Sequence, residues 1–190
     1  MKRPLFTRYF VPFLQWYALM ILIAIGLDFL LHKLQLRSIG LYLGYAGTFT
    51  VAISFVYSLR KRKIITRGSP KKLLELHEYL SWAGSVMLLV HAGIHFNSIL
   101  PWLAILMLLT AVASGLVGKF LLKNAREMLA EKKKYLIESG LSKEEAERKL
   151  FFDSITVDMM KNWRKAHIPI TGSLLVLSLF HILSVMIFST

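Results

Sequence analysis

Residues 100–122 have the sequence LPWLAILMLLTAVASGLVGKFLL, in which Lys119 is the only charged side chain. A helix needs about 20 mostly apolar residues to cross the hydrocarbon layer of a membrane, and this segment meets both requirements. Four other segments are comparably long and apolar, namely residues 10–31, 39–59, 76–96 and 168–188. The 190 residues therefore predict an all-α integral membrane protein, a single bundle of five transmembrane helices.

The overall composition excludes several classes of protein. Hydrophobic residues make up 55% of the chain and the mean hydropathy is +0.54, which is too apolar for a soluble domain of this size. Because the chain has no cysteine, it cannot form a disulfide, a thiolate-bound iron–sulfur cluster or the covalent haem attachment of c-type cytochromes. Any cofactor must be held by other side chains.

The net charge of +13 predicts topology rather than nucleic-acid binding, because the basic residues lie almost entirely in loops between the apolar segments. Lys and Arg accumulate on the cytoplasmic side of a membrane. If the N-terminus is cytoplasmic, all but Lys33 and Arg37 of the 24 basic residues lie on that side. We therefore expect an N-in, C-out protein surrounded by lipid, in the cytoplasmic (inner) membrane of a prokaryote.

The segment from Lys123 to Ala166 is the one sizeable region expected outside the bilayer. Its acidic and basic residues are mixed, which is typical of solvated helix, and Ser139-Gly140 interrupts it. Ser142 followed by Glu145 predicts a capping box at the start of a short helix that continues through Leu150. The segment is thus interpreted as a cytoplasmic helical loop that links two spans, with a docking surface for a redox partner as the alternative.

Four of the six histidines form the most informative pattern in the chain. His77 and His91 belong to the third predicted span, His167 and His181 belong to the fifth, and both pairs are 14 residues apart. In an α-helix, 14 residues rise about 21 Å and return to within roughly 40° of the same face. With five spans, the third and fifth helices are parallel. The pattern therefore predicts that His77 faces His167 near the inner surface and that His91 faces His181 near the outer surface.

A facing pair of imidazoles can supply both axial ligands of a haem iron that lies between two helices. Two such pairs predict two haems, one near each membrane surface. The alternative is that the histidines form hydrogen bonds across helices or lie at the membrane interface. That alternative does not explain why the same spacing occurs on two parallel helices.

With these two His-x13-His patterns, the chain resembles the transmembrane dihaem cytochromes b. It looks like the ferric reductase-like membrane domain and is similar to the cytochrome b subunits of quinone-linked respiratory complexes, over roughly the last two-thirds of its length. The resemblance implies two non-covalent haems b, transmembrane electron transfer and redox partner subunits on one or both faces. The chain departs from full ferric reductases because it has no flavin or nicotinamide domain, and it has five predicted spans where that group usually has six.

Several further residues are weaker candidates for contact with the cofactors. Gly84 lies midway between His77 and His91, where a missing side chain leaves room for a porphyrin face. Lys71, Arg164 and Lys165 flank the inner histidine pair and are candidates to neutralise haem propionates, although the positive-inside rule already explains their presence. A separate pattern, Ser114 with Gly118, predicts close helix packing in the fourth span.

Other polar groups in the spans bear on quinone chemistry. His95, one helical turn beyond His91, could ligate in place of His91, since it is 18 residues or five full turns from His77, but only the 14-residue spacing of His91 matches the fifth span. His95 is otherwise a candidate contact for a quinone or a haem propionate, and the alternative is an ordinary interfacial histidine. Asp28 and Glu78 are candidate proton relays, and the alternative is that each simply reaches the headgroups.

The leading hypothesis is an electron-transfer subunit with two bis-histidine haems b. One competing hypothesis is a haem-free transporter subunit for transition-metal ions or protons, which would need several ligands gathered at one depth, such as His91 with His95. Another is an enzyme in which His95 and Asp28 form a quinol-oxidising or metal-reducing site beside the outer haem.

Overall fold

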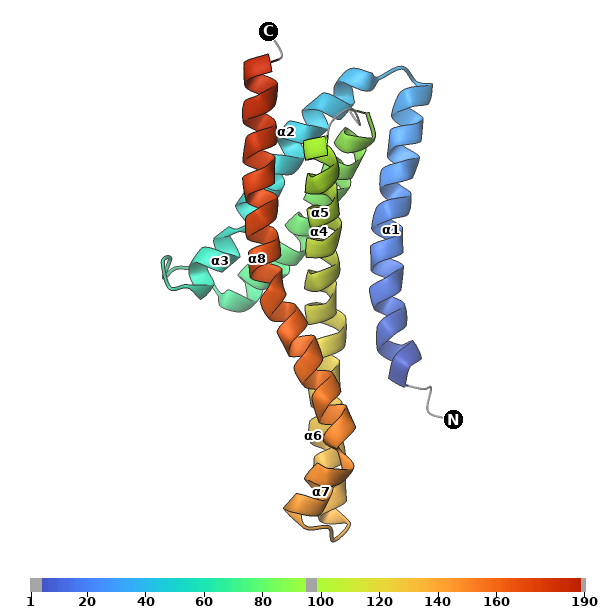
Figure 1. The fold of residues 1–190 in the computed structure, drawn as a ribbon, viewed down its shortest axis with the longest axis vertical. Helices are drawn as coiled ribbons and strands as arrows, with labels where there is room; N and C mark the ends of the chain where they lie inside the picture. The colour runs from blue at the N-terminus through green and yellow to red at the C-terminus, as the bar shows by residue number, and fades with distance from the viewer. Residues whose placement is uncertain (1–4, 95–98, 189–190) are drawn as a thin grey trace.

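The computed structural model describes residues 5–94 and 99–188, and these residues form helices joined by short turns, with no β-strand among them (Figure 1). In chain order the helices are α1 (Leu5–Lys33), α2 (Arg37–Ser54), α3 (Val56–Lys61), α4 (Pro70–Ile94), α5 (Ile99–Leu116), the π-helical segment η1 (Val117–Leu122), α6 (Lys123–Glu138), α7 (Lys143–Lys149) and α8 (Phe151–Phe188). The expectation of an all-α protein is confirmed for this part of the chain.

Four helical segments in the described residues are long and apolar enough to cross a membrane. They are Phe10–Lys33, Ser38–Lys61, Ile99–Glu138 and Phe151–Phe188. The remaining predicted span falls in α4, which has the length but is less apolar because it carries His77, Glu78 and His91. A helix that packs among other helices can carry such groups, since they need not face lipid.

Helix α4 lies at the centre of the bundle, because α1, α2, α3 and α5 all pack against it. Met20 and Ala24 of α1 form a buried cluster with Val86 and Val90 of α4. Glycines bring α2 and α4 together, since a Cβ added at Gly84 would lie 2.7 Å from Cγ2 of Val51 and 3.1 Å from the backbone oxygen of Gly47. Small residues at such a crossing allow two helices in a membrane to approach closely.

Helices α5 and α8 form an antiparallel pair that continues beyond the other helices as a stalk made of α6, α7 and the first half of α8 (Figure 1). Helix α8 contains 38 residues, which corresponds to about 57 Å. The expected boundary between loop and span near Ala166 is not a break, because α8 runs through it without interruption. Helix α8 bends about midway (Figure 1), and Pro169, which cannot donate a backbone hydrogen bond, lies inside it.

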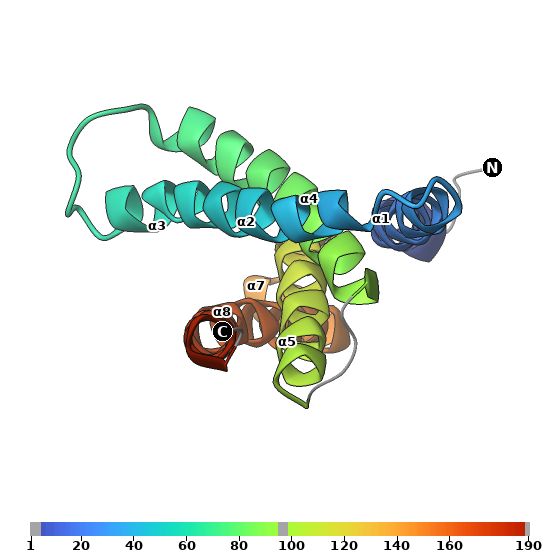
Figure 2. The same ribbon diagram turned by 90° about the horizontal axis from the view of Figure 1, so that it is seen from above.

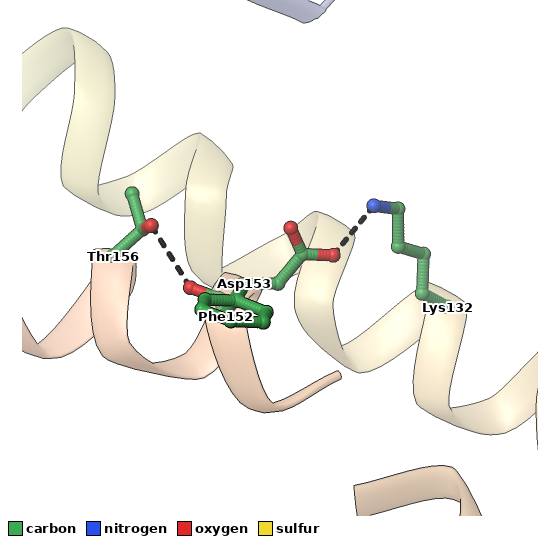
Figure 3. Close-up of polar contacts among 4 residues, drawn as sticks. All are labelled: Lys132, Phe152, Asp153 and Thr156. Atoms are coloured by element: carbon green, nitrogen blue, oxygen red, sulfur yellow. Dashed lines mark hydrogen bonds and ion pairs between the residues drawn. The ribbon is translucent and has the colours of Figure 1, made fainter. Parts of the chain in front are cut away.

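The stalk has the local features of a solvated hairpin. Ser142 begins α7 with the predicted capping box, in which its hydroxyl accepts from the Glu145 amide and the Glu145 carboxylate accepts from the Ser142 amide. The pairs Lys132–Asp153 and Lys133–Glu147, each 2.6 Å apart, join the two sides of the hairpin (Figure 3 shows the first). Exposed pairs of this kind contribute about 0–1 kcal/mol each.

The chain ends lie at opposite ends of the bundle. The N-terminal end of α1 is on the side of the stalk and the end of α8 is on the other side (Figure 1). Viewed from above, α2 with α3 and α4 cross the bundle beside the α5–α8 pair, and α1 stands at the far end of α2 (Figure 2). Helices α4 and α8 both run away from the stalk side (Figure 1).

Candidate functional site: two histidine pairs between α4 and α8

The structure brings four histidines together as two pairs that join α4 to α8. The ring centroids of His77 and His167 lie 6.5 Å apart with an angle of 83° between the ring planes. The ring centroids of His91 and His181 lie 6.4 Å apart with an angle of 58°. Both combinations pair residues at the same depth on parallel helices, so the two pairs are separated by 14 residues of helix, or about 21 Å. We call them the inner pair and the outer pair.

His77 of the inner pair is held by the end of α2. Its Nδ1 lies 3.0 Å from the backbone oxygen of Ser54, the last residue of α2. The final carbonyl groups of a helix have no partner within the helix, so the termination of α2 at this residue leaves an acceptor for the imidazole. Since a carbonyl oxygen can only accept, Nδ1 of His77 carries the proton. The ring of Tyr57 in α3 stacks on His77 with centroids 5.6 Å apart.

His91 of the outer pair is held by the beginning of α2. Its Nδ1 donates to the backbone oxygen of Gly40 over 2.9 Å. One turn further along α2, Gly44 lies directly under the ring, because a Cβ added there would be 2.7 Å from Nδ1 and 2.8 Å from Cε1 and Cγ. Only glycine leaves room for the imidazole at this distance.

His167 takes its support from α5. The hydroxyl of Ser114, which is fully buried, donates to the backbone oxygen of Ala111 over 2.7 Å and lies 2.5 Å from Nδ1 of His167. The hydroxyl of Ser114 therefore contacts both the Ala111 carbonyl oxygen and the imidazole of His167. A Cβ at Gly115 would lie 3.7 Å from Cε1 of the same ring, so α5 also borders this imidazole through a residue without a side chain.

Two of these histidines share one tautomer. In His77 and His91 the proton is on Nδ1, because each of these nitrogens bonds to a backbone carbonyl oxygen. Metal-ligating histidines usually donate their other ring nitrogen to a carbonyl, carboxylate or similar acceptor, which fixes the orientation of the ring. This arrangement is what a metal ligand requires.

The separation of the rings also fits a shared metal ion. A metal–imidazole bond is about 2 Å long and a ring nitrogen lies about 1.2 Å from its centroid, so two imidazoles on opposite sides of one ion have centroids about 6.4 Å apart. The observed values of 6.5 and 6.4 Å agree with this arrangement. Each pair could thus supply two imidazole nitrogens to one metal ion, such as the iron of a haem.

The weaker candidates are not drawn into these pairs. Gly84 lies in the contact between α2 and α4, so its missing side chain serves helix packing. Lys71 in the first turn of α4 and Lys165, two residues before His167, have exposed side chains. His95 and the side chain of Arg164 lie outside the described residues.

An ion pair lies next to the inner pair. Glu78, which follows His77, is 2.8 Å from the ammonium group of Lys119 in η1. The same ammonium group lies 5.5 Å from the ring centroids of Tyr79 and Phe120. Glu78 therefore neutralises Lys119, the one charged residue of segment 100–122, within the protein. This lowers the free-energy cost of placing the charge in an apolar segment.

Sequence reasoning missed the groups that hold the imidazoles. The segment GLYLG at residues 40–44 is a G-x-x-x-G pattern, which indicates close approach between membrane helices and could have suggested that α2 receives another helix here. The predicted packing role of Ser114 was incomplete, since this residue also bonds His167. No local signal in the sequence indicated that Ser54 would end α2.

The histidine pairs are the candidate site that the structure supports best. Within the described part of the chain, no group of three or more His, Asp or Glu side chains lies close enough to hold a metal ion. Comparisons with protein-family models, curated proteins and solved structures found no match.

Proposed function

We propose that this chain is the cytochrome b subunit of a larger redox complex and transfers electrons across the membrane through two haems b. His77 and His167 hold the inner haem, and His91 and His181 hold the outer one. The observation that carries the proposal is that both pairs have the ring separation expected for two imidazoles on one ion, while Nδ1 of His77 and of His91 donates to a backbone carbonyl oxygen, as metal-ligating histidines usually do.

The topology that goes with this proposal has five spans, with the N-terminus and the stalk in the cytoplasm. Helix α4 is then the third crossing, and its His77, Glu78 and His91 contact other helices. All but Lys33 and Arg37 of the basic residues lie on the cytoplasmic side in this orientation, as the positive-inside rule requires. The stalk would offer redox partners a surface on that side.

In this proposal the haems, when bound, supply one-electron chemistry at their irons. The chain supplies everything else. The backbone oxygens of Ser54 and Gly40 accept hydrogen bonds from Nδ1 of His77 and His91, which would strengthen these imidazoles as ligands and so would stabilise an oxidised iron. The bundle partly buries all four histidines.

The purified protein tests the proposal by its reduced-minus-oxidised visible spectrum and its haem content. We expect two extractable haems b per chain. His91→Ala and His181→Ala should each remove one and the same haem, and His77→Ala and His167→Ala should each remove the other. Protein that contains no haem when expressed with an adequate haem supply would refute the proposal.

The grouping of the variants tests the pairing separately. If His91→Ala and His167→Ala removed the same haem, the helices would pair in the opposite sense. As a matched control, His32→Ala alters an exposed histidine at the end of α1 and should leave both haems in place.

A further inference from the structure

The stalk end of the chain carries apolar side chains on two opposite faces of α8. Leu150 and Val157 are seven residues apart on one face, and both are buried within the stalk. Phe152, Ile155 and Met159 lie about 140–160° around the helix from Val157, and their exposed fractions are 80%, 41% and 68%. A helix that is apolar on opposite faces is usually covered on both of them. The hairpin covers one face only.

The exposed face follows the heptad spacing of a coiled coil, with steps of three and four residues. We call it the outer stripe, and its members are Phe152, Ile155, Met159, Asn162 and Ala166. Phe151 and Trp163 flank the stripe and are also exposed. The stripe contains no charged residue, whereas Asp153 points toward Lys132 of α6 on another face (Figure 3).

Lipid does not explain the outer stripe at its stalk end. Phe152 is 15 residues, or about 22 Å of helix, before His167, and this part of α8 belongs to the stalk that continues beyond the other helices (Figure 1). Asp158 and Lys161, on other faces of the same turns, have exposed side chains. In a single copy of the chain the apolar stripe therefore faces water, and a patch of this kind indicates an interaction surface.

We propose that the outer stripe binds the outer stripe of a second copy of this chain, so that two stalks pair about a two-fold axis along the membrane normal. All copies inserted with one topology direct their stalks to the same side of the membrane. Two paired stalks are then parallel, and each residue of the stripe meets its own counterpart, as in a parallel coiled coil. The inference does not depend on the haems.

The chemistry of the stripe favours a second copy over a different partner. A neutral apolar surface is complementary to itself, and it offers no charge for a partner of opposite sign. Asn162 lies at a heptad core position, where one polar pair fixes the register of two parallel helices.

The exposed area is also sufficient for a dimer. Five large side chains, namely Phe151, Phe152, Ile155, Met159 and Trp163, each expose on the order of 100 Å². Each copy therefore contributes roughly 500 Å², and the pair about 1,000 Å², which reaches the area expected of a specific interface.

The same spacing continues along the membrane-spanning half of α8. It is found at Ser173, Val176, Phe180, Leu183 and Ile187, whose side chains are all exposed. One interface can thus extend from the stalk along the span. His167 and His181 each follow a position of this spacing by one residue, or about 100°, so the interface does not include the two histidine pairs.

Single cysteines test the proposal directly, because the chain has no native cysteine. In liposomes, Ile155→Cys and Met159→Cys should each form a disulfide-linked dimer on mild oxidation, since equivalent residues at a two-fold axis come within reach of a disulfide bond. Ser154→Cys is the matched control, because this exposed residue lies beside Ile155 in sequence but on another face of α8. We expect the control to cross-link at least tenfold more slowly.

Met159→Glu tests association without cross-linking. Two carboxylates would meet across the axis, and we expect at least tenfold weaker association. The measurement is energy transfer between chains that carry a dye on a cysteine added after Thr190, at increasing ratios of lipid to protein. Ser154→Glu adds the same charge outside the stripe and should associate like the unaltered chain. Both residues are exposed, and circular dichroism checks that both variants keep their helix content.

Other results overturn the proposal. If cysteines at residues 155 and 159 cross-link no faster than the one at residue 154, the stripes do not face each other. If in native membranes they cross-link instead to a protein of different mass, the stripe binds another subunit. If the chain is monomeric and a dye at residue 155 reports a lipid environment, the stripe lies on the membrane surface. In each of these cases the haem content is unaffected and the proposed function stands, whereas a haem-free chain that dimerises refutes the proposed function alone.

Discussion

Gly44→Ala should remove the outer haem while leaving the inner one in place. A Cβ at residue 44 would lie 2.7–2.8 Å from three atoms of the His91 ring. An ordinary contact between such atoms is about 3.5–4.0 Å, so the ring must move by roughly 0.8 Å. A metal–imidazole bond of about 2 Å does not stretch by that amount. The movement also strains the hydrogen bond from His91 to Gly40, and we expect haem affinity at the outer pair to fall about 10- to 100-fold.

The assay is the haem-to-protein ratio of the purified variant at increasing concentrations of added haem. Gly26→Ala is the matched control, because a Cβ at that residue of α1 would meet nothing within 4 Å. The control should keep two haems, and Gly44→Ala should keep one at low haem concentration. A Gly44→Ala variant that retained both haems at wild-type affinity would show that His91 does not need the position it has in the structure.

Three further results are expected. Ser114→Ala should remove the hydrogen bond between the Ser114 hydroxyl and Nδ1 of His167 and weaken the inner haem about tenfold while the outer haem is retained, as measured by haem titration and the midpoint potential. A reporter active only outside the cytoplasm should work when fused after Thr190 but fail when inserted in the turn between α6 and α7, and the opposite result would invert the topology. In the stalk, the hydrogen bond and charge of Lys133 hold the pKa of Glu147 below its ordinary value of 4.5. Its contribution to stability is therefore present above pH 4.5 and is lost as the pH falls through the lowered pKa, and Lys133→Ala should return the titration, followed by NMR of labelled Glu carboxyl groups, to the usual range.

Much of the helix pattern was predictable because lipid imposes one simple requirement on each crossing. Segments such as residues 100–122 must be long and apolar, and the structure contains four helices of this kind in its described part. Helix α4 does not meet this criterion of length and hydropathy, since His77 and His91, which form the candidate site, also lower its hydropathy. The side-by-side positions of His77 with His167 and His91 with His181 followed from the 14-residue spacing together with the predicted parallel direction of the two helices.

What the sequence could not show is how the imidazoles are held. The acceptors for His77 and His91 are backbone oxygens of α2, and a backbone oxygen has no signature in the sequence. Which face of α4 meets α2 depends on the packing of Gly47 and Gly84, and this is a property of the whole bundle. For the same reason Gly84 could be assigned to a cofactor face in the sequence although it lies in a helix contact. The continuity of α8 through Ala166 was missed because charged residues mark the membrane surface but do not end a helix.

The bend in α8 gives the two histidines of that helix, which are proposed as haem ligands, different mechanical surroundings. His167 is two residues before Pro169, on the stalk side, whereas His181 is twelve residues beyond it. If a partner protein pushed the stalk sideways and α8 bent further at Pro169, His167 would move with the part of the helix before the proline. His181 would stay in place with the part after it. Docking at the stalk would then displace His167 of the inner pair but not His181 of the outer pair. Binding of a partner would therefore affect only the inner of the two proposed haem sites.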